Sequence, residues 1–93
     1  MEQYDLKNKI TIIIVLYRED YNLLYNTLDK IREFRKIIID NSNNEDLKSK
    51  VEANFEIEKY ILNIKNIGFS AGYNQGVKLC ETDFCFILGP DCI

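Results

Sequence analysis

The chain has 93 residues, of which 46% are hydrophobic and 29% are charged, and its formal net charge is −3. This composition is typical of one small globular domain. Twelve basic residues scattered among fifteen acidic ones leave no basic face for a phosphate backbone, which argues against a nucleic-acid partner. No apolar run approaches the roughly 18 to 20 residues of a membrane span, and the first residues lack a signal-peptide core, so we expect a cytoplasmic protein without a transmembrane segment.

Four runs of strand length occur along the chain. Residues 10–16 are nearly continuously apolar and β-branched, as in a strand that is covered on both faces of a parallel sheet. The other runs are residues 36–40, 59–63 and 84–88. We therefore expect four strands.

Segments with helical periodicity separate these runs. Asp20 is expected to cap a first helix that ends near Phe34. Ser42 and Glu45 have the spacing of a capping box for a second, shorter helix, and Ser70 is expected to cap a third. The side chains expected on the buried faces of these helices are Leu24, Leu28, Ile31, Leu47, Val51 and Val77.

Strands that alternate with helices of these lengths predict right-handed crossovers, and hence an α/β fold with a parallel sheet. In such sheets ligands bind beyond the carboxyl ends of the strands, near the point where the chain order reverses. Polar loops begin there at Tyr17, Asp40, Asn63 and Gly89. Any one of them alone is best interpreted as a solvated turn, but four together favour a ligand crevice.

Residues 66–76 read Asn-Ile-Gly-Phe-Ser-Ala-Gly-Tyr-Asn-Gln-Gly and contain three of the four glycines. Glycine allows positive φ and close approach to a ligand, and the helix that follows offers free N–H groups to an anion. The segment suits a diphosphate or a ribose. Taken alone, this glycine spacing also fits a tight turn with close packing of the helix on a strand.

The cysteines, Cys80, Cys85 and Cys92, are odd in number and include no Cys-x-x-Cys pair, and the chain has no histidine. We expect buried, reduced thiols, and neither a zinc site nor a thioredoxin-like redox centre. The absence of histidine leaves acid–base chemistry to carboxylates.

Four blocks in order resemble the amino-terminal half of a family 2 glycosyltransferase. They read Ile-Ile-Val-Leu-Tyr-Arg-Glu-Asp, Ile-Ile-Ile-Asp-Asn-Ser, the glycine segment, and Phe-Ile-Leu-Gly-Pro-Asp. The likeness covers about residues 10–92 and is greatest to the rhamnosyltransferase-like bacterial branch. It implies the Rossmann-like, three-layer half of a GT-A fold, with parallel strands in the order 3-2-1-4 and helices on both faces. It also implies transfer of a sugar, with inversion, from a uridine or thymidine diphosphate donor to a glycan.

The resemblance implies roles for residues after the first two strands. Leu16, Tyr17 and Glu19 match the segment beside the donor base and ribose, where an acidic group can accept from ribose hydroxyls. Asp40 matches the carboxylate that hydrogen-bonds the base. Two alternatives stay open: Tyr17 as a cover for the end of the sheet, and Asp40 as a turn acceptor for the amides that follow it.

The glycine block carries further implied roles. The residues that match the family's block beside the nucleotide are Asn66, Gly68, Gly72, Asn74 and Gly76. We expect Gly68 and Gly72 to shape the backbone and Asn74 to make a polar contact. Phe69 is expected in the core rather than as a platform for the ligand.

Asp91 matches the last acidic residue of the family's Asp-x-Asp motif, which holds Mg²⁺ or Mn²⁺. Gly89 stands at the first position of that motif and has no ligating side chain, so metal binding is expected to be weak or absent. The alternative for Asp91 is an aspartate in a turn after proline.

The sequence stops two residues after Asp91, whereas the family's acceptor site and catalytic base lie beyond that point. We therefore assign no catalytic residue. Residues 1–93 are expected to form one truncated nucleotide-sugar-binding domain that does not transfer sugar alone, whether as a fragment, a truncated gene product or half of a complex. The edge of the fourth strand and apolar side chains around Phe84, Phe86 and Leu88 would then lack cover, so we expect self-association through that edge or patch.

Two alternatives come from other functional classes: a non-catalytic nucleotide-binding module, and a degenerate structural remnant that binds no nucleotide. A receiver domain is disfavoured because the first strand ends in Tyr17 without an acidic pocket, and a dinucleotide oxidoreductase because Gly-x-Gly-x-x-Gly is missing there.

Overall fold

Four strands form one parallel sheet in the order β3-β2-β1-β4. The structure, a computed structural model, describes residues 6–89, with side chains from Asn8 onward. The strands are β1 (Ile10–Leu16), β2 (Arg35–Asp40), β3 (Lys59–Leu62) and β4 (Phe84–Ile87). The predicted α/β class, parallel pairing and strand order are confirmed.

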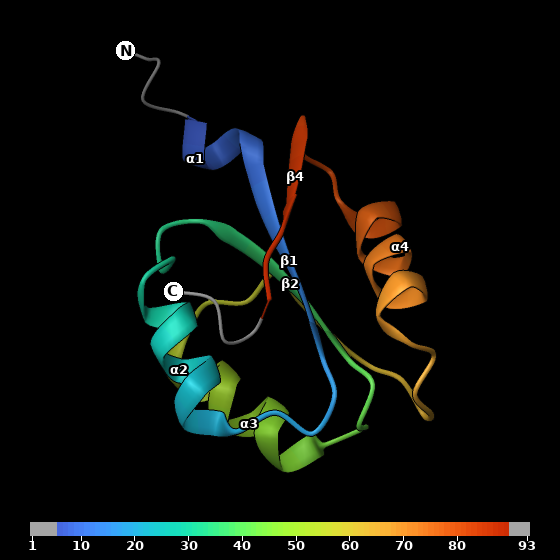
Figure 1. Cartoon of the computed structure of the whole chain (residues 1–93). Helices are drawn as coiled ribbons and strands as arrows, with labels where there is room; N and C mark the ends of the chain where they lie inside the picture. Colours follow the sequence, from blue (N-terminus) through green and yellow to red (C-terminus); the bar gives the residue numbers. More distant parts are fainter. Residues whose placement is uncertain (1–5, 90–93) are drawn as a thin grey trace.

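Helices cover both faces of this sheet. They are α1 (Leu6–Lys9), α2 (Tyr21–Asp29), α3 (Glu45–Asn54) and α4 (Phe69–Leu79). Helices α2 and α3 lie on one face and α4 lies on the other (Figure 1). The chain order reverses at β1, whose neighbours are β2 and β4. None of the described helices is long and apolar enough to cross a bilayer.

The core has two parts because alternate residues of β1 face opposite sides of the sheet. Ile12, Ile14 and Leu16 pack with the inner side chains of α2 and α3. Ile13 and Val15 pack on the α4 side with residues of β2. The continuous apolar run of β1 therefore reflects a strand that is buried on both faces, as the sequence predicted.

Helix α4 contacts the sheet through glycines. A Cβ at Gly72 would lie 2.9 Å from Val15 Cγ1, and a Cβ at Gly76 would lie 2.5 Å from Ile13 Cγ2. The buried face of α4 is thus its glycine face, and Val77, which was predicted to be buried, is 45% exposed. Phe69 is 51% exposed, so its predicted place in the core is also wrong.

The predicted caps differ from those in the structure. Asp20 precedes α2 as predicted, but its side chain makes no capping hydrogen bond among the described residues. Asn44 rather than Ser42 caps α3, because its Oδ1 accepts from the Leu47 amide at 3.0 Å. Gly68 rather than Ser70 precedes α4. Leu47 and Val51 are buried beneath α3, as predicted.

Lys36 holds the turn that follows α2, which ends at Asp29 rather than near Phe34. Its side chain is fully buried, and Nζ donates to the carbonyls of Ile31 at 3.2 Å, Arg32 at 3.0 Å and Phe34 at 2.8 Å. Three ammonium hydrogens thus meet three carbonyl oxygens of the turn before β2. Burial lowers the pKa of the Lys36 ammonium.

The expectation of reduced, buried thiols is wrong for two cysteines. Cys80 and Cys85 form a disulfide, and both residues are only half-buried. Cys80 ends α4 and Cys85 lies within β4, so the bond joins the helix to the strand across the connection between them. Sequence spacing missed this pair because the turn, not a Cys-x-x-Cys motif, brings the sulfurs together. Cys92 lies outside the described residues.

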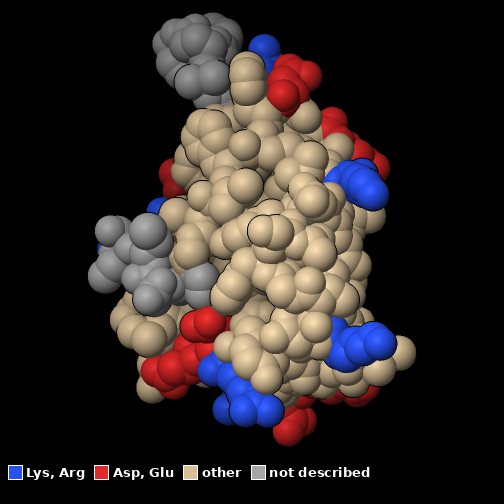
Figure 2. Space-filling model, turned by 45° about the vertical axis from the view of Figure 1, so that its right-hand side comes forward, with Lys and Arg blue, Asp and Glu red and all other residues tan. Residues whose placement is uncertain are grey.

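Figure 2 shows the surface with α4 turned forward. Charged side chains lie toward the edges of this view, and the central region is free of them. The exposed apolar side chains of α4 and β4 include Phe69, Val77 and Ile87.

We predict that Lys36→Met destabilises the fold by about 1 to 3 kcal/mol, because three carbonyls of the α2–β2 turn lose their donor. Methionine keeps the length of the buried side chain but not its hydrogen bonds. Urea unfolding measures the change, with Lys30→Met as the exposed control at the end of α2. Equal losses of stability in the two variants would contradict the role of Lys36.

Candidate functional site

Three strands end level with one another. Leu16 of β1 pairs with Asp40 of β2, and Asp40 pairs with Leu62 of β3. The loops that follow them start along one rim of the sheet. Strand β4 ends before β1 does, because its last pair is Ile87 with Ile13, and the Leu88 amide donates to the Ile13 carbonyl at 3.1 Å. The end of β4 is therefore set back from the rim that the other three strands form.

Asp40 is a fully buried carboxylate at this rim. Its Oδ1 accepts from the Ser42 amide at 2.8 Å, and its Oδ2 accepts from the Tyr60 hydroxyl at 2.9 Å. Asp40 thus plays the turn-acceptor role that was left open for it. Burial, reinforced by the charge of Asp40, raises the pKa of Tyr60. A ligand can reach Asp40 only if the loop after β2 shifts.

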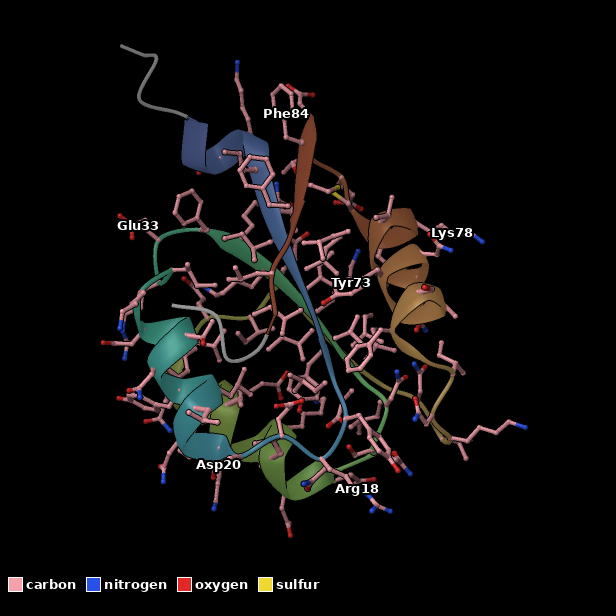
Figure 3. The ribbon with its side chains drawn as sticks, viewed as in Figure 1. Arg18, Asp20, Glu33, Tyr73, Lys78 and Phe84 are labelled. Carbon is pink, nitrogen blue, oxygen red and sulfur yellow. A yellow bond between two sulfur atoms is a disulfide. The ribbon has the colours of Figure 1, made fainter. Side chains whose placement is uncertain are left out.

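The loop after β1 borders a hollow of about 740 Å³. Leu16 is fully buried, whereas Tyr17 is 36% exposed and lies with its ring 5.1 Å from the Arg18 guanidinium. The backbone turns sharply here, with φ 56° at Arg18, whose amide donates to Ser42 Oγ. The residues that line the hollow are Arg18, Glu19, Ser42, Asn43, Asn44, Glu45 and Asp46. Arg18 and Asp20 mark this end of the molecule in Figure 3.

Gly68 begins the glycine segment's helix in a backbone conformation that suits glycine, with φ 87°. Its amide donates to Asn66 Oδ1 at 2.8 Å. Gly72, in contrast, is helical and acts by close packing on Val15. Both glycines therefore shape the backbone. Gly68 adopts a positive φ, and Gly72 lets α4 approach β1 closely. Tyr73, next to Gly72, extends from α4 toward the sheet (Figure 3).

The amino ends of α3 and α4 differ electrostatically. Helix α3 has a side-chain cap at Asn44 and two acids in its first turn, Glu45 and Asp46. Helix α4 has no acid in its first turn, and no described side chain caps it. Within the described part of the chain, the positive end of the α4 dipole therefore has no acid beside it in the first turn, which is a condition that favours an anion.

Asn74 does not share the rim. It lines a second hollow, of about 620 Å³, on the β3 side of α4. The other residues of this hollow are Ile61, Ile67, Ala71, Gln75, Lys78 and Leu79. Of the residues singled out from the sequence, the structure gathers Leu16, Tyr17, Glu19, Asp40 and Gly68 around the ends of β1 and β2, with Asn66 bonded to Gly68.

Sequence reasoning missed three amide side chains. Asn41 and Asn63 are the first residues after the neighbouring strands β2 and β3, and their side chains hydrogen-bond each other at 2.8 Å. Asn63 also bonds Gln75 of α4. An asparagine at the same position after two adjacent parallel strands is a signal that could have revealed the pair.

The described residues do not form a metal site. No group of three or more His, Cys, Asp or Glu side chains within the described part of the chain could hold an ion. Asp91, the predicted ligand, lies outside that part. The described side chains by themselves therefore do not fit a divalent metal.

We predict that the free energy of unfolding falls as the pH rises above about 10, where tyrosine ordinarily ionises. The folded state holds the Tyr60 proton more tightly than the unfolded state, so this contribution is complete below pH of about 10 and is lost above it. Urea unfolding between pH 8 and 11 measures the slope. Tyr60→Phe should flatten it, and an unchanged slope in that variant would remove Tyr60 as the cause.

A comparison with models of known protein families identifies the family of the chain. The family model described as Glycosyl transferase family 2 matches residues 11–93, which include all four strands from Thr11 onward, the rim and the glycine segment. No curated protein and no solved structure matches the chain. Because the family match spans nearly the whole sequence, the chain belongs to glycosyl transferase family 2.

Proposed function

We propose that the rim binds a nucleoside diphosphate sugar, of the uridine or thymidine type, as the donor for transfer to a glycan. Family membership supports a sugar-transfer function. The observation that carries the proposal is the amino end of α4, which has no acid in its first turn and follows Gly68 beside the loop after β2. A diphosphate is the part of such a donor that this helix end suits.

The base and ribose are proposed to lie along the loop after β1. The partly exposed ring of Tyr17 offers a surface for stacking, and Glu19 accepts from ribose hydroxyls. Leu16, which is fully buried, supports the start of this loop from within the core. The hollow beyond them has three acids, Glu19, Glu45 and Asp46, against one base, Arg18. This balance repels a diphosphate and so favours the neutral parts of the donor on this side.

The diphosphate is proposed to lie at the first turn of α4. Gly68 and Asn66 shape that turn, and Gly72 allows the helix to approach the sheet. Asp40 supports the base side by holding the loop at Ser42. The contact predicted for Asn74 stays a prediction, as does the metal ligand Asp91. The rhamnosyltransferase-like branch, a role in polysaccharide synthesis and the cytoplasmic location rest on the sequence resemblance and composition.

Isothermal titration of the folded chain with uridine and thymidine diphosphates, with and without Mn²⁺, tests the proposal. We expect Tyr17→Ala to weaken binding by about 1 to 3 kcal/mol, the usual loss for one stacking aromatic ring. Leu23→Ala is the matched control, because Leu23 is an exposed apolar residue on α2.

Absence of binding to every nucleotide by the native chain would contradict the proposal and favour the structural-remnant alternative.

Release of free sugar from the donor is measured in the same samples. We expect none from the chain alone, because no residue in it matches the family's catalytic base.

A second copy of the chain is the proposed partner of β4. This strand pairs with β1 along one edge, and no other described strand pairs with its outer edge. Its side chains are apolar and exposed, with Phe84 at 54%, Phe86 at 56% and Ile87 at 58%. An uncharged, unpaired edge of this kind favours pairing with another chain.

We predict that the chain sediments as a dimer at high concentration and that Phe86→Lys makes it monomeric. The new charge would be buried without a partner if the β4 strands of two copies met. Leu23→Lys, on α2, is the control and should stay dimeric. A native chain that remains monomeric at every concentration would exclude this interface.

A further inference from the structure

We propose that Asn41, Asn63 and Gln75 act as positioning residues that set the amino end of α4 for the donor. This inference rests on the proposed function, because the three residues would position the helix end that is proposed to hold the diphosphate. The three amides come from the ends of β2 and β3 and from α4, and they link these elements to Gly68.

The network is continuous. Asn41 Nδ2 donates to the Gly68 carbonyl at 3.1 Å, and Asn41 Oδ1 accepts from Asn63 Nδ2 at 2.8 Å. Asn63 and Gln75 exchange two further bonds, from Asn63 Nδ2 to Gln75 Oε1 at 2.9 Å and from Gln75 Nε2 to Asn63 Oδ1 at 3.2 Å. Asn41 is 2% exposed, so it acts on a ligand only through the groups it holds.

Gly68 needs this support because packing does not hold it. It is exposed, its φ is 87°, and a Cβ built on it would meet nothing within 4 Å. Two hydrogen bonds from outside the helix fix its peptide groups, from its amide to Asn66 Oδ1 and to its carbonyl from Asn41. The same carbonyl also accepts from the Gly72 amide at 3.0 Å, which is a bond of the first turn of α4.

Asn41 also joins the two proposed parts of the donor site. Its backbone amide donates to the Leu16 carbonyl at 2.8 Å, and it stands between Asp40 and Ser42, which shape the loop toward the hollow. Its side chain must donate to one partner and accept from another at the same time. A primary amide can do both, whereas an ionised carboxylate only accepts and an aliphatic side chain does neither.

Asn41→Leu tests the proposal because leucine keeps the approximate volume and adds no charge. Asn26→Leu, at an exposed position on α2, is the matched control. Two quantities are measured on the whole chain: the affinity for uridine diphosphate, and the hydrogen-exchange rate of the Gly72 amide relative to that of the Ile14 amide in β1. The ratio reports local opening of α4 apart from global stability.

We expect Asn41→Leu to weaken the affinity about tenfold and to speed Gly72 exchange relative to Ile14 by a similar factor, as loss of about one hydrogen bond implies. Asn26→Leu should change neither quantity. Gln75→Ala should show the same pattern, which keeps the test decisive if Asn41→Leu does not fold.

The outcomes separate the two proposals. If the native chain binds no nucleotide, the proposed function fails, and with it the purpose given to the network. If the native chain binds but Asn41→Leu and Gln75→Ala bind equally well, the positioning role is overturned whatever the exchange rates show. Loss of affinity with unchanged relative exchange at Gly72 would also overturn it, because Asn41 would then act by another route.

Discussion

The contact between the glycine face of α4 and β1 sets the geometry of the whole rim. No side chain fits between Gly72 and Val15 or between Gly76 and Ile13 without displacing one of them. The helix therefore lies nearer the sheet than a helix with larger side chains on that face would allow. Gly68, the residue that precedes α4, comes within hydrogen-bond reach of Asn41 at the end of β2. The loops and the helix end form a common surface because of this approach.

The second constraint is that polar groups at both ends of β2 are buried and paired. Lys36 closes the turn before the apolar centre of the strand, and Asp40 and Asn41 close the loops after it. An unpaired buried group of this kind costs about 1 to 3 kcal/mol. Each end of β2 is therefore held in one arrangement, and the loop after β2 is held with it.

Strand and helix positions were largely predictable because apolar periodicity is local. The bounds of β1 and the buried residues Leu47 and Val51 agreed with the structure. The strand order, which the family resemblance implied, is also confirmed. The errors involve side-chain contacts that apolar periodicity does not encode. Lys36 holds a turn where a longer α2 was predicted, and Cys80 bonds Cys85 across the connection before β4. The Ser42 hydroxyl accepts from the Arg18 amide, which is distant in sequence, while Asn44 caps α3.

The sequence by itself determined the family, the α/β class and the positions of the polar residues that follow each strand. These results depend on the order of motifs and on the alternation of apolar runs, which are properties of the chain. Only the tertiary structure decided which of those residues meet. It buried Asp40 against Tyr60, set Asn74 on the β3 side of α4 and joined Asn41 to Gly68. The Asp40–Tyr60 contact depends on the pairing of β2 with β3. The bond from Asn41 to Gly68 depends on the distance between α4 and the sheet, which the packing of glycine on valine and isoleucine sets and which no single segment encodes.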